Sequence, residues 1–251
     1  MPASLPDLPI HVLIAIPAVV LLAYTIFGAT GFGSTIIAVP LLAHALPLTV
    51  SVPLMTSLDL FAATGTALRN RAHVAWRECR VLAPALVIGI ALGAALLVSL
   101  PAGPALVSLG AFVTAYGVYI LAGAHRLRRA PAWLAWPFGI AGGVFSALFG
   151  TGGPVYMVFL SARIHDKSTL RATASLMVTL SVWLRLAFFA LTGVLLHAQL
   201  FVLVLALLPV MALGLHLGHR LHQRLSSAGV LRLIAALLLI NGVTLLARAL
   251  A

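Results

Sequence analysis

The chain has very few charged residues and almost no cysteine. Only four of its 251 residues are acidic, and charged residues of both signs make up 8%. The single cysteine, Cys79, excludes an internal disulfide bond and any site built on two thiols. With 63% hydrophobic residues, the composition is typical of an integral membrane protein. Apolar runs occupy almost the whole chain, so we expect one all-α membrane domain over residues 1–251.

The basic residues are gathered in a few short loops. In a soluble protein a formal net charge of +11 would suggest a nucleic-acid partner, but here the charges separate apolar runs. The positive-inside rule then places these loops in the cytoplasm, and we expect no nucleic-acid partner. Residues 1–9 contain no Lys or Arg, so no cleavable signal peptide is predicted. The clusters are Arg69, Arg71, Arg77 and Arg80; Arg126, Arg128 and Arg129; Arg163, Lys167 and Arg171; and Arg220, Arg224 and Arg232.

These loop charges predict six full membrane crossings and two helical hairpins. The connections 45–49, 100–104 and 191–200 contain no Lys or Arg, so they lie opposite the basic loops. Because of these loop charges, each of the apolar stretches 10–45 and 133–162 must begin and end on the same side of the membrane, as a helical hairpin does. Both chain termini are then predicted outside a bacterial-type inner (plasma) membrane. The crossings are predicted at 48–68, 81–100, 105–122, 169–191, 200–217 and 228–246.

The sequence also contains an internal duplication with an offset of 122 residues. FGATG at 27–31 corresponds to FGTGG at 149–153, and LMTSL at 54–58 corresponds to LMVTL at 176–180. Each repeat, 1–126 and 132–251, begins with a Gly-broken hairpin and continues with three crossings. Because a hairpin adds no net crossing, each repeat has an odd number of crossings, and the second repeat is predicted to be inverted.

The two glycine-rich turns form the principal candidate binding site. A helix broken at membrane depth leaves backbone groups that protein or a water-filled cavity must satisfy. The returning helix presents its first amides and the positive end of its dipole, which favours an anion. The alternative is that the glycines only allow close helix packing. The predicted substrate-binding residues are Gly28, Thr30, Gly31, Gly33 and Ser34 in the first turn and Gly150, Thr151, Gly152 and Gly153 in the second.

Two charged residues, Asp59 and Arg185, fall inside predicted crossings, where ionisable groups usually face a partner, a cavity or a substrate path. We expect Arg185 to bind the substrate anion through its planar guanidinium, and Asp59 to orient that group or to accept a proton. The alternative is a permanent structural ion pair, or an Arg185 that extends to the outer interface.

Hydroxyl side chains on the same two crossings are candidates for a polar lining or for coupling. Hydroxyls in such positions more often bond only the backbone of their own helix, which is the alternative for this set. The residues are Thr56, Ser57, Ser175 and Thr179.

No pattern in the sequence indicates catalysis. It contains no P-loop, no Gly-x-Ser-x-Gly and no His-Glu-x-x-His. The spaced histidines His216, His219 and His222 have no carboxylate nearby, so no metal site is predicted. We therefore expect no enzyme activity, no catalytic residues and no cofactor.

Over nearly its whole length the chain resembles the TauE/SafE sulfite exporter family of membrane transporters. The resemblance lies in the two halves that each open with a broken segment, FGATGFGSTIIAVPLL at 27–42 and FGTGGPVYMVFL at 149–160. Membership would imply secondary transport, without nucleotide hydrolysis, of small sulfur-containing or carboxylated anions such as sulfite, a sulfonate or sulfoacetate.

These observations favour a secondary transporter, and an exporter in particular, that works by alternating access around paired glycine turns near the membrane midplane. An anion channel and, further off, a membrane-embedded enzyme are the alternatives. The expected partners are a small anion and the lipid bilayer. Coupling to protons and pairing as a homodimer are left open by the sequence.

Overall fold

The computed structural model describes residues 10–30, 33–70, 73–122, 130–191, 198–222 and 227–250. Within these residues the chain forms only helices, as predicted: ten α-helices, one short 3-10 helix and no strand. The elements are α1 (Ile10–Thr30), α2 (Ser34–Leu42), α3 (Leu48–Asn70), α4 (Trp76–Ser99), α5 (Ala102–Leu121), η3 (Ala132–Leu134), α6 (Ala135–Phe149), α7 (Gly153–Arg163), α8 (Lys167–Leu191), α9 (Ala198–His222) and α10 (Ser227–Leu250).

Six segments of the described residues are long and apolar enough to cross a bilayer. Five of them coincide with predicted crossings on α3, α4, α5, α8 and α9. The sixth is Ala132–Phe149, which the sequence analysis assigned to one arm of a hairpin. The predicted crossing at 228–246 lies on α10, where the apolar helix within the residues searched is Ile234–Ala249. An all-helical, polytopic membrane protein is therefore confirmed.

The two predicted hairpins each have a long arm and a short arm. α1 has 21 residues and α2 has nine, so at about 1.5 Å per residue their lengths are about 31 and about 14 Å. In the second half, η3 and α6 together extend over Ala132–Phe149 and are followed by the 11-residue α7. Each returning arm is thus only long enough to reach about halfway through a hydrocarbon core of about 30 Å.

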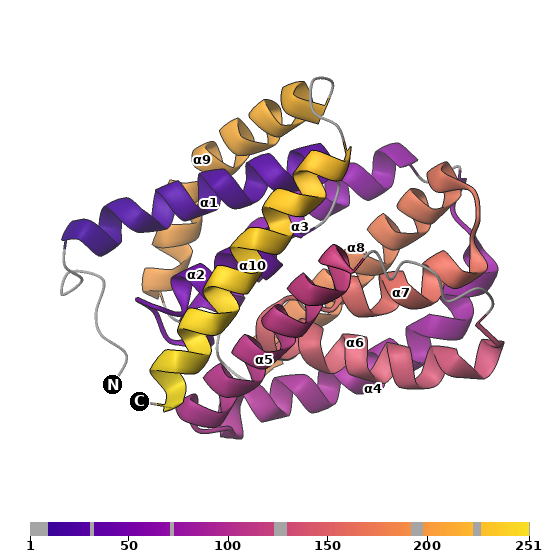
Figure 1. Ribbon diagram of the computed structural model, residues 1–251, viewed down its shortest axis with the longest axis horizontal. Coiled ribbons are helices and arrows are strands. Elements are labelled where there is room, and N and C mark those ends of the chain that lie inside the picture. Colours follow the sequence, from indigo (N-terminus) through magenta and orange to yellow (C-terminus); the bar gives the residue numbers. More distant parts are fainter. Residues whose placement is uncertain are drawn as a thin grey trace.

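Helices from the two halves pack against one another in matched pairs (Figure 1). α1 packs on α9, and its counterpart α6 packs on α4, the counterpart of α9. α3 packs on α8 and α5 on α10, each against its own counterpart. Exchanging the halves therefore preserves the main contacts. The opposite orientation of the two halves in the membrane stays a prediction.

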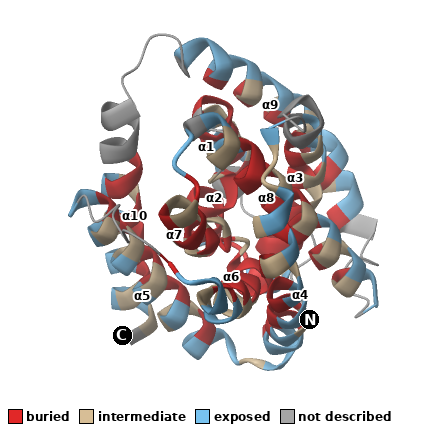
Figure 2. Cartoon of the chain, turned by 90° about the vertical axis from the view of Figure 1, so that its right-hand side faces the viewer, coloured by how far each residue is buried: buried red, intermediate tan, exposed pale blue. Residues whose placement is uncertain are grey.

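The two short helices lie in the middle of this arrangement. Figure 2 shows buried residues around α2, α7 and α6, with exposed residues on the outward faces of α9 and α5. Every residue of α2 except Leu41 is buried. The outward faces carry large apolar side chains such as Phe201, which is 66% exposed, as expected where lipid is the solvent.

Glycines allow the closest helix approaches. On the α4–α6 contact, a Cβ built on Gly89 would overlap the carbonyl oxygen of Ile140. On the α1–α9 contact, a Cβ on Gly28 would lie 2.6 Å from the carbonyl oxygen of Leu215. For Gly28, therefore, the structure shows the close packing that the sequence analysis gave as the alternative to substrate binding.

We expect Gly89→Ala to lower the stability of the protein, by about 1–3 kcal/mol, because the added methyl group forces α4 and α6 apart. Gly65→Ala on α3 is the matched control, since a Cβ there meets no atom within 4 Å. That change should be neutral or stabilising by up to about 1 kcal/mol. Thermal unfolding of both variants in detergent measures the difference, and equal melting temperatures would contradict the packing argument.

Candidate functional site

The two glycine turns meet at the centre of the molecule. Gly33, with φ 95°, precedes the first residue of α2, and Gly150, with φ 71°, ends α6 just before α7 begins. A Cβ on Gly150 would overlap the side chain of Thr35 and lie 3.0 Å from Nη1 of Arg185. Positive φ and this crowding both exclude larger residues at Gly150. The turns of the two halves are thus in direct contact.

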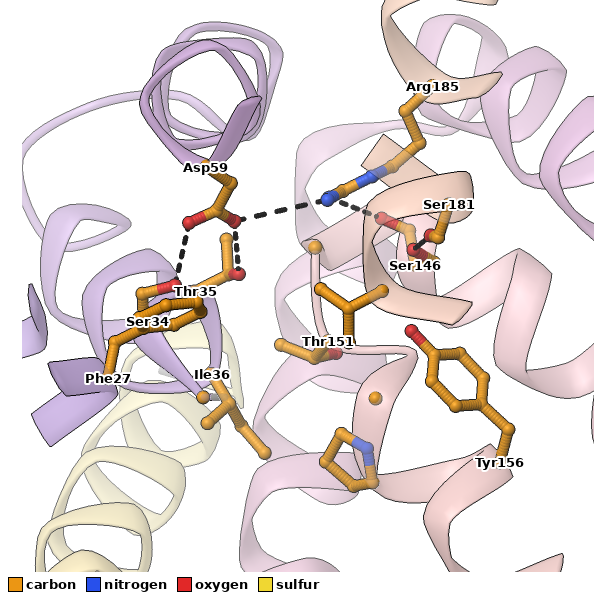
Figure 3. Close-up of a pocket in the computed structure, with 15 residues that line it drawn as sticks. Phe27, Ser34, Thr35, Ile36, Asp59, Ser146, Thr151, Tyr156, Ser181 and Arg185 are labelled. Carbon is orange, nitrogen blue, oxygen red and sulfur yellow. Dashed lines mark hydrogen bonds and ion pairs between the residues drawn. The ribbon is translucent and has the colours of Figure 1, made fainter. Parts of the chain in front are cut away.

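A small cavity lies between the turns (Figure 3). It measures about 20 Å³, which is room for about one water molecule. Both halves contribute to its wall: α1, α2 and α3 on one side, α6, α7 and α8 on the other. Five predicted glycine-turn residues line it, together with the predicted Asp59 and Arg185; the five are Gly33, Ser34, Gly150, Thr151 and Gly153.

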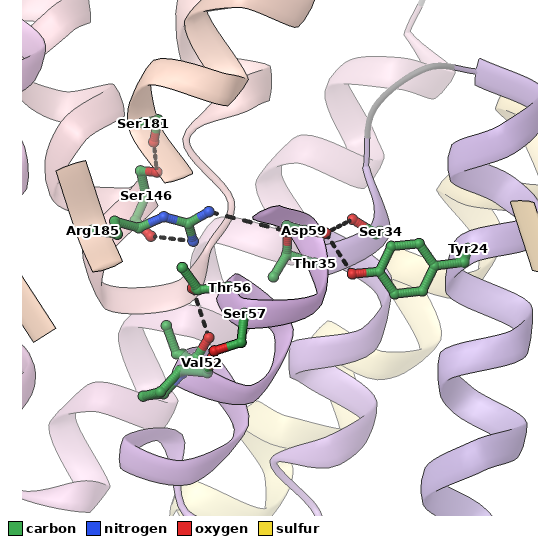
Figure 4. Close-up of polar contacts among 11 residues, drawn as sticks. Tyr24, Ser34, Thr35, Val52, Thr56, Ser57, Asp59, Ser146, Ser181 and Arg185 are labelled. Carbon is green, nitrogen blue, oxygen red and sulfur yellow. Dashed lines mark hydrogen bonds and ion pairs between the residues drawn. The ribbon is translucent and has the colours of Figure 1, made fainter. Parts of the chain in front are cut away.

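Asp59 is held at the first-half wall by three hydroxyl groups (Figure 4). The hydroxyls of Tyr24 and Ser34 each donate to Oδ1 at 2.7 Å, and that of Thr35 donates to Oδ2 at 3.0 Å. The residue is 2% exposed. A buried carboxylate needs such donors because it has lost its hydration, so the hairpin formed by α1 and α2 is tied to α3 at this point.

Arg185 faces Asp59 from the second half. Its Nη2 is 4.0 Å from Oδ2 of Asp59, and its Nη1 donates to the carbonyl oxygen of Ser146 at 3.0 Å. The side chain is 2% exposed, so it lies in the protein interior and does not extend to the membrane interface. The ion pair anticipated from sequence is therefore present, but it is long and engages only part of the guanidinium.

Two polar groups of this site lack a hydrogen-bond partner among the described residues. Nε of Arg185 and Oγ1 of Thr151 are both buried without a hydrogen-bond partner in that part of the chain. No side chain caps the first amides of α2 or of α7. A buried polar atom without a partner costs about 1–3 kcal/mol, so these donors are suited to an acceptor from outside, such as the oxygen of an anion.

The duplication also relates the polar groups of the two walls. An offset of 122 residues carries Asp59 to Ser181 and Tyr24 to Ser146, and these two serines are hydrogen-bonded to each other as Tyr24 is to Asp59. The same offset carries Ser34 to Tyr156, whose hydroxyl points toward the two serines (Figure 3). Tyr24, Ser146 and Tyr156 are not among the predicted site residues, although the offset could have found the last two once Tyr24 and Ser34 were placed beside Asp59.

The four hydroxyl residues predicted as lining do not line this cavity. Thr56 donates to the carbonyl of Val52 at 2.7 Å and Ser57 to that of Pro53 at 2.9 Å, both within α3. Thr179 donates to the carbonyl of Ser175 at 2.8 Å and also, across helices, to that of Ala63 at 3.1 Å. Thr56 and Ser57 therefore follow the backbone alternative, whereas Thr179 bonds both its own helix and α3.

The remaining predicted residues divide into two groups. Gly28 and Gly152 are described but do not line the cavity. Gly31 and the side chain of Thr30 lie outside the described residues.

Comparison with known proteins agrees with this architecture. The family model for the sulfite exporter TauE/SafE matches residues 16–245. The chain belongs to the TauE/SafE family. It is similar to the probable inner membrane transporter protein TsaS of Comamonas testosteroni, with 27% identity over 177 residues, which is 70% of this chain and 74% of that protein. No solved structure matches the chain.

Family membership and the six apolar helices make this chain an integral membrane transporter. Its partners are accordingly a small anionic substrate and the surrounding lipid.

We expect Gly150→Ala to disrupt the site, because the alanine would have to adopt a positive φ and would push against Thr35. Gly153→Ala is the matched control: the nearest atom to a Cβ there is in Val178, at 3.9 Å. The first variant should lose about 1–3 kcal/mol of stability and the second less than about 1 kcal/mol. Thermal unfolding in detergent compares them, and a fully stable Gly150→Ala protein would show that the turns are not in contact.

Proposed function

We propose that this protein is a secondary transporter, in the exporting direction, of a small sulfur-containing or organic anion such as sulfite, a sulfonate or sulfoacetate. It would act in a bacterial-type inner membrane by alternating access. The observation that carries the proposal is the buried guanidinium of Arg185, which has an unpartnered Nε and lines a cavity shared by the glycine turns of both halves. The family match and the similarity to an inner membrane transporter support the same class of function.

An oxyanion suits this site because its oxygens can accept from several converging donors at once. Arg185 supplies a planar fork, Thr151 supplies a hydroxyl, and the N-termini of α2 and α7 supply amides and the positive ends of two helix dipoles. The guanidinium and the helix N-termini would repel a cation, because they are positively charged. Selection among anions would then follow from the space that opens between the turns.

The Asp59–Arg185 pair suggests how transport is coupled. The pair is neutral when the carboxylate is ionised, so an arriving monovalent anion leaves one uncompensated negative charge in a dry interior. Proton uptake by Asp59 would restore neutrality and release Arg185 to the substrate. In this scheme one proton accompanies each monovalent anion, so the outward concentration gradient of the anion, and not the proton gradient, drives export. Asp59 takes the place of the substrate beside Arg185 when none is bound.

The size of the cavity favours a transporter over the channel alternative. A cavity that holds about one water molecule is too small for a sulfonate to pass through. Contact between Thr35 and Gly150 also closes the space between the turns. Substrate entry therefore requires the two hairpins to separate. Contacts between halves at the periphery would have to change as well, among them the paired Arg163 on α7 and Glu78 on α4.

Arg185→Ala should abolish anion flux into or out of liposomes that contain the purified protein. Arg171→Ala, at an exposed position of the same helix, should retain flux close to that of the unaltered protein. Radiolabelled sulfite and a sulfonate serve as substrates.

Breaking a buried pair by removing one partner costs about 3–5 kcal/mol, so folding is checked with Asp59→Asn/Arg185→Gln, which removes both charges together. This double variant should fold but not transport. Normal flux in either Arg185 variant would remove Arg185 from the substrate site.

Asp59→Asn tests the proton step. If Asp59 accepts the proton, the variant should lose anion-dependent proton movement, measured with a pH-sensitive dye inside the liposomes, and exchange of one anion for another should lose its pH dependence. Ser57→Ala, on the same helix but bonded only to its own backbone, is the control. If proton movement persists in Asp59→Asn, Asp59 is not the proton acceptor and serves only to position Arg185.

A further inference from the structure

A second and larger cavity lies at the end of the bundle where α4 ends and α5 begins. It encloses about 390 Å³, within the range of pockets that hold small molecules. Its wall combines the α2–α3 connection, the last turn of α4, the first turns of α5 and the end of α10. This cavity shares no residue with the one between the glycine turns.

The wall contains both apolar side chains and one cation. Leu46, Leu97, Leu100 and Leu106 form much of the apolar part. The cation is Arg248, whose Nη1 donates to the backbone carbonyl of His44 at 2.7 Å, so the guanidinium is held at the cavity by a fixed contact.

The histidine that holds Arg248 is itself fixed in place. The ring of His44 bonds the carbonyl of Pro40 through Nδ1 at 2.9 Å and the hydroxyl of Thr244 through Nε2 at 3.3 Å. These contacts connect α10 with the end of α2. They make the cationic rim of the cavity a built feature of the fold.

No acidic side chain of the described residues neutralises Arg248. Asp59 is bonded in the central site and Glu78 is paired with Arg163. Asp166 accepts hydrogen bonds from Ser168 and Thr169 at the start of α8, which hold the pKa of its carboxyl well below the ordinary range. Of the four acidic side chains in the chain, only that of Asp7 lies outside the described residues. The positive charge therefore calls for an anion from outside the described fold.

We propose that this cavity binds an acidic phospholipid, with its phosphate at Arg248 and an acyl chain along the leucine wall. A small water-soluble anion would gain from the charge but nothing from the apolar wall, whereas an acidic lipid matches both. The neighbouring outward side chains Leu96, Val98 and Val243 are 38%, 56% and 56% exposed, as expected of a surface in contact with the bilayer. The cavity therefore lies beside a surface that contacts lipid.

The position of α2 gives such a lipid a route to influence the central site. The N-terminal residues Ser34 and Thr35 line the central cavity, while Ala43 and His44, just beyond its C-terminal end, line the lipid cavity. A lipid held at Arg248 would restrain the far end of the helix that carries part of the substrate site. The lipid proposal itself depends on the membrane location of the protein and not on which anion is transported.

Native mass spectrometry of the purified protein tests the proposal, with phosphatidylglycerol compared against phosphatidylcholine. Phosphatidylglycerol should bind in preference, and Arg248→Gln should weaken its binding about fivefold or more, the loss expected for one basic contact. Arg171→Gln is the matched control and should bind as the unaltered protein does. Ala102→Phe, at an exposed position on the cavity wall, should weaken lipid binding without removing a charge.

Two results would overturn the proposal. Equal binding of the two lipids, or no effect of Arg248→Gln, would mean that Arg248 already has a counterion or takes none. Displacement of phosphatidylglycerol by millimolar inorganic phosphate would mean that the cavity is a site for free anions and not for lipid. None of these measurements involves flux, so the lipid site can fail while the transport proposal stands, and the reverse.

Discussion

A carboxylate and a guanidinium that are both removed from water must neutralise each other, and in this protein they come from opposite halves of the chain. Asp59 and Arg185 are each 2% exposed, and Nη2 of the arginine lies 4.0 Å from Oδ2 of the aspartate. Because either charge alone would be costly, α3 and α8 must pack together and both hairpins must deliver their polar groups to the same point. The glycine turns, the short return helices and the hydroxyl cluster are all arranged around this requirement.

The two members of this pair are unequally bonded within the described residues. Asp59 receives three hydroxyl donors, whereas Arg185 has one firm hydrogen bond, to the carbonyl of Ser146, and an unpartnered Nε. The carboxylate of Asp59 thus receives its hydrogen bonds from residues of its own half, whereas the guanidinium of Arg185 retains a donor that can bind a further acceptor. Under the proposed function, this difference between the two groups is what allows a substrate anion to bind at Arg185.

Both halves use one plan with different side chains. The cluster of Tyr24, Asp59 and Ser34 corresponds through the 122-residue offset to Ser146, Ser181 and Tyr156, so the tyrosine and the serine exchange places and only one half retains a carboxylate. A duplicated site with equal charges would place two carboxylates side by side. The serine at the position corresponding to Asp59, together with the arginine one turn further along α8, makes a single asymmetric site from two equivalent frameworks.

Much of the fold could be predicted from short stretches of the sequence. The helical membrane fold, five of the six crossings and the interior position of Asp59 and Arg185 follow from apolar run length and the cost of intramembrane charge. Side-chain direction around a helix was harder to predict. Thr56 and Asp59 are three residues apart on α3, yet only Asp59 lines the cavity, while Thr56 bonds its own helix.

By itself, the sequence determined that the chain is a duplicated helical membrane protein with two broken hairpins and one buried charge of each sign. Only the tertiary structure decided that the turns touch through Thr35 and Gly150, that the space between them holds about one water molecule, and that Gly28 packs against α9. The composition of each segment and the spacing of its apolar residues determine the free energy of placing that segment in lipid, and both can be read from the sequence. Contacts between segments distant in the chain depend on how whole helices pack, and that information is distributed over both halves.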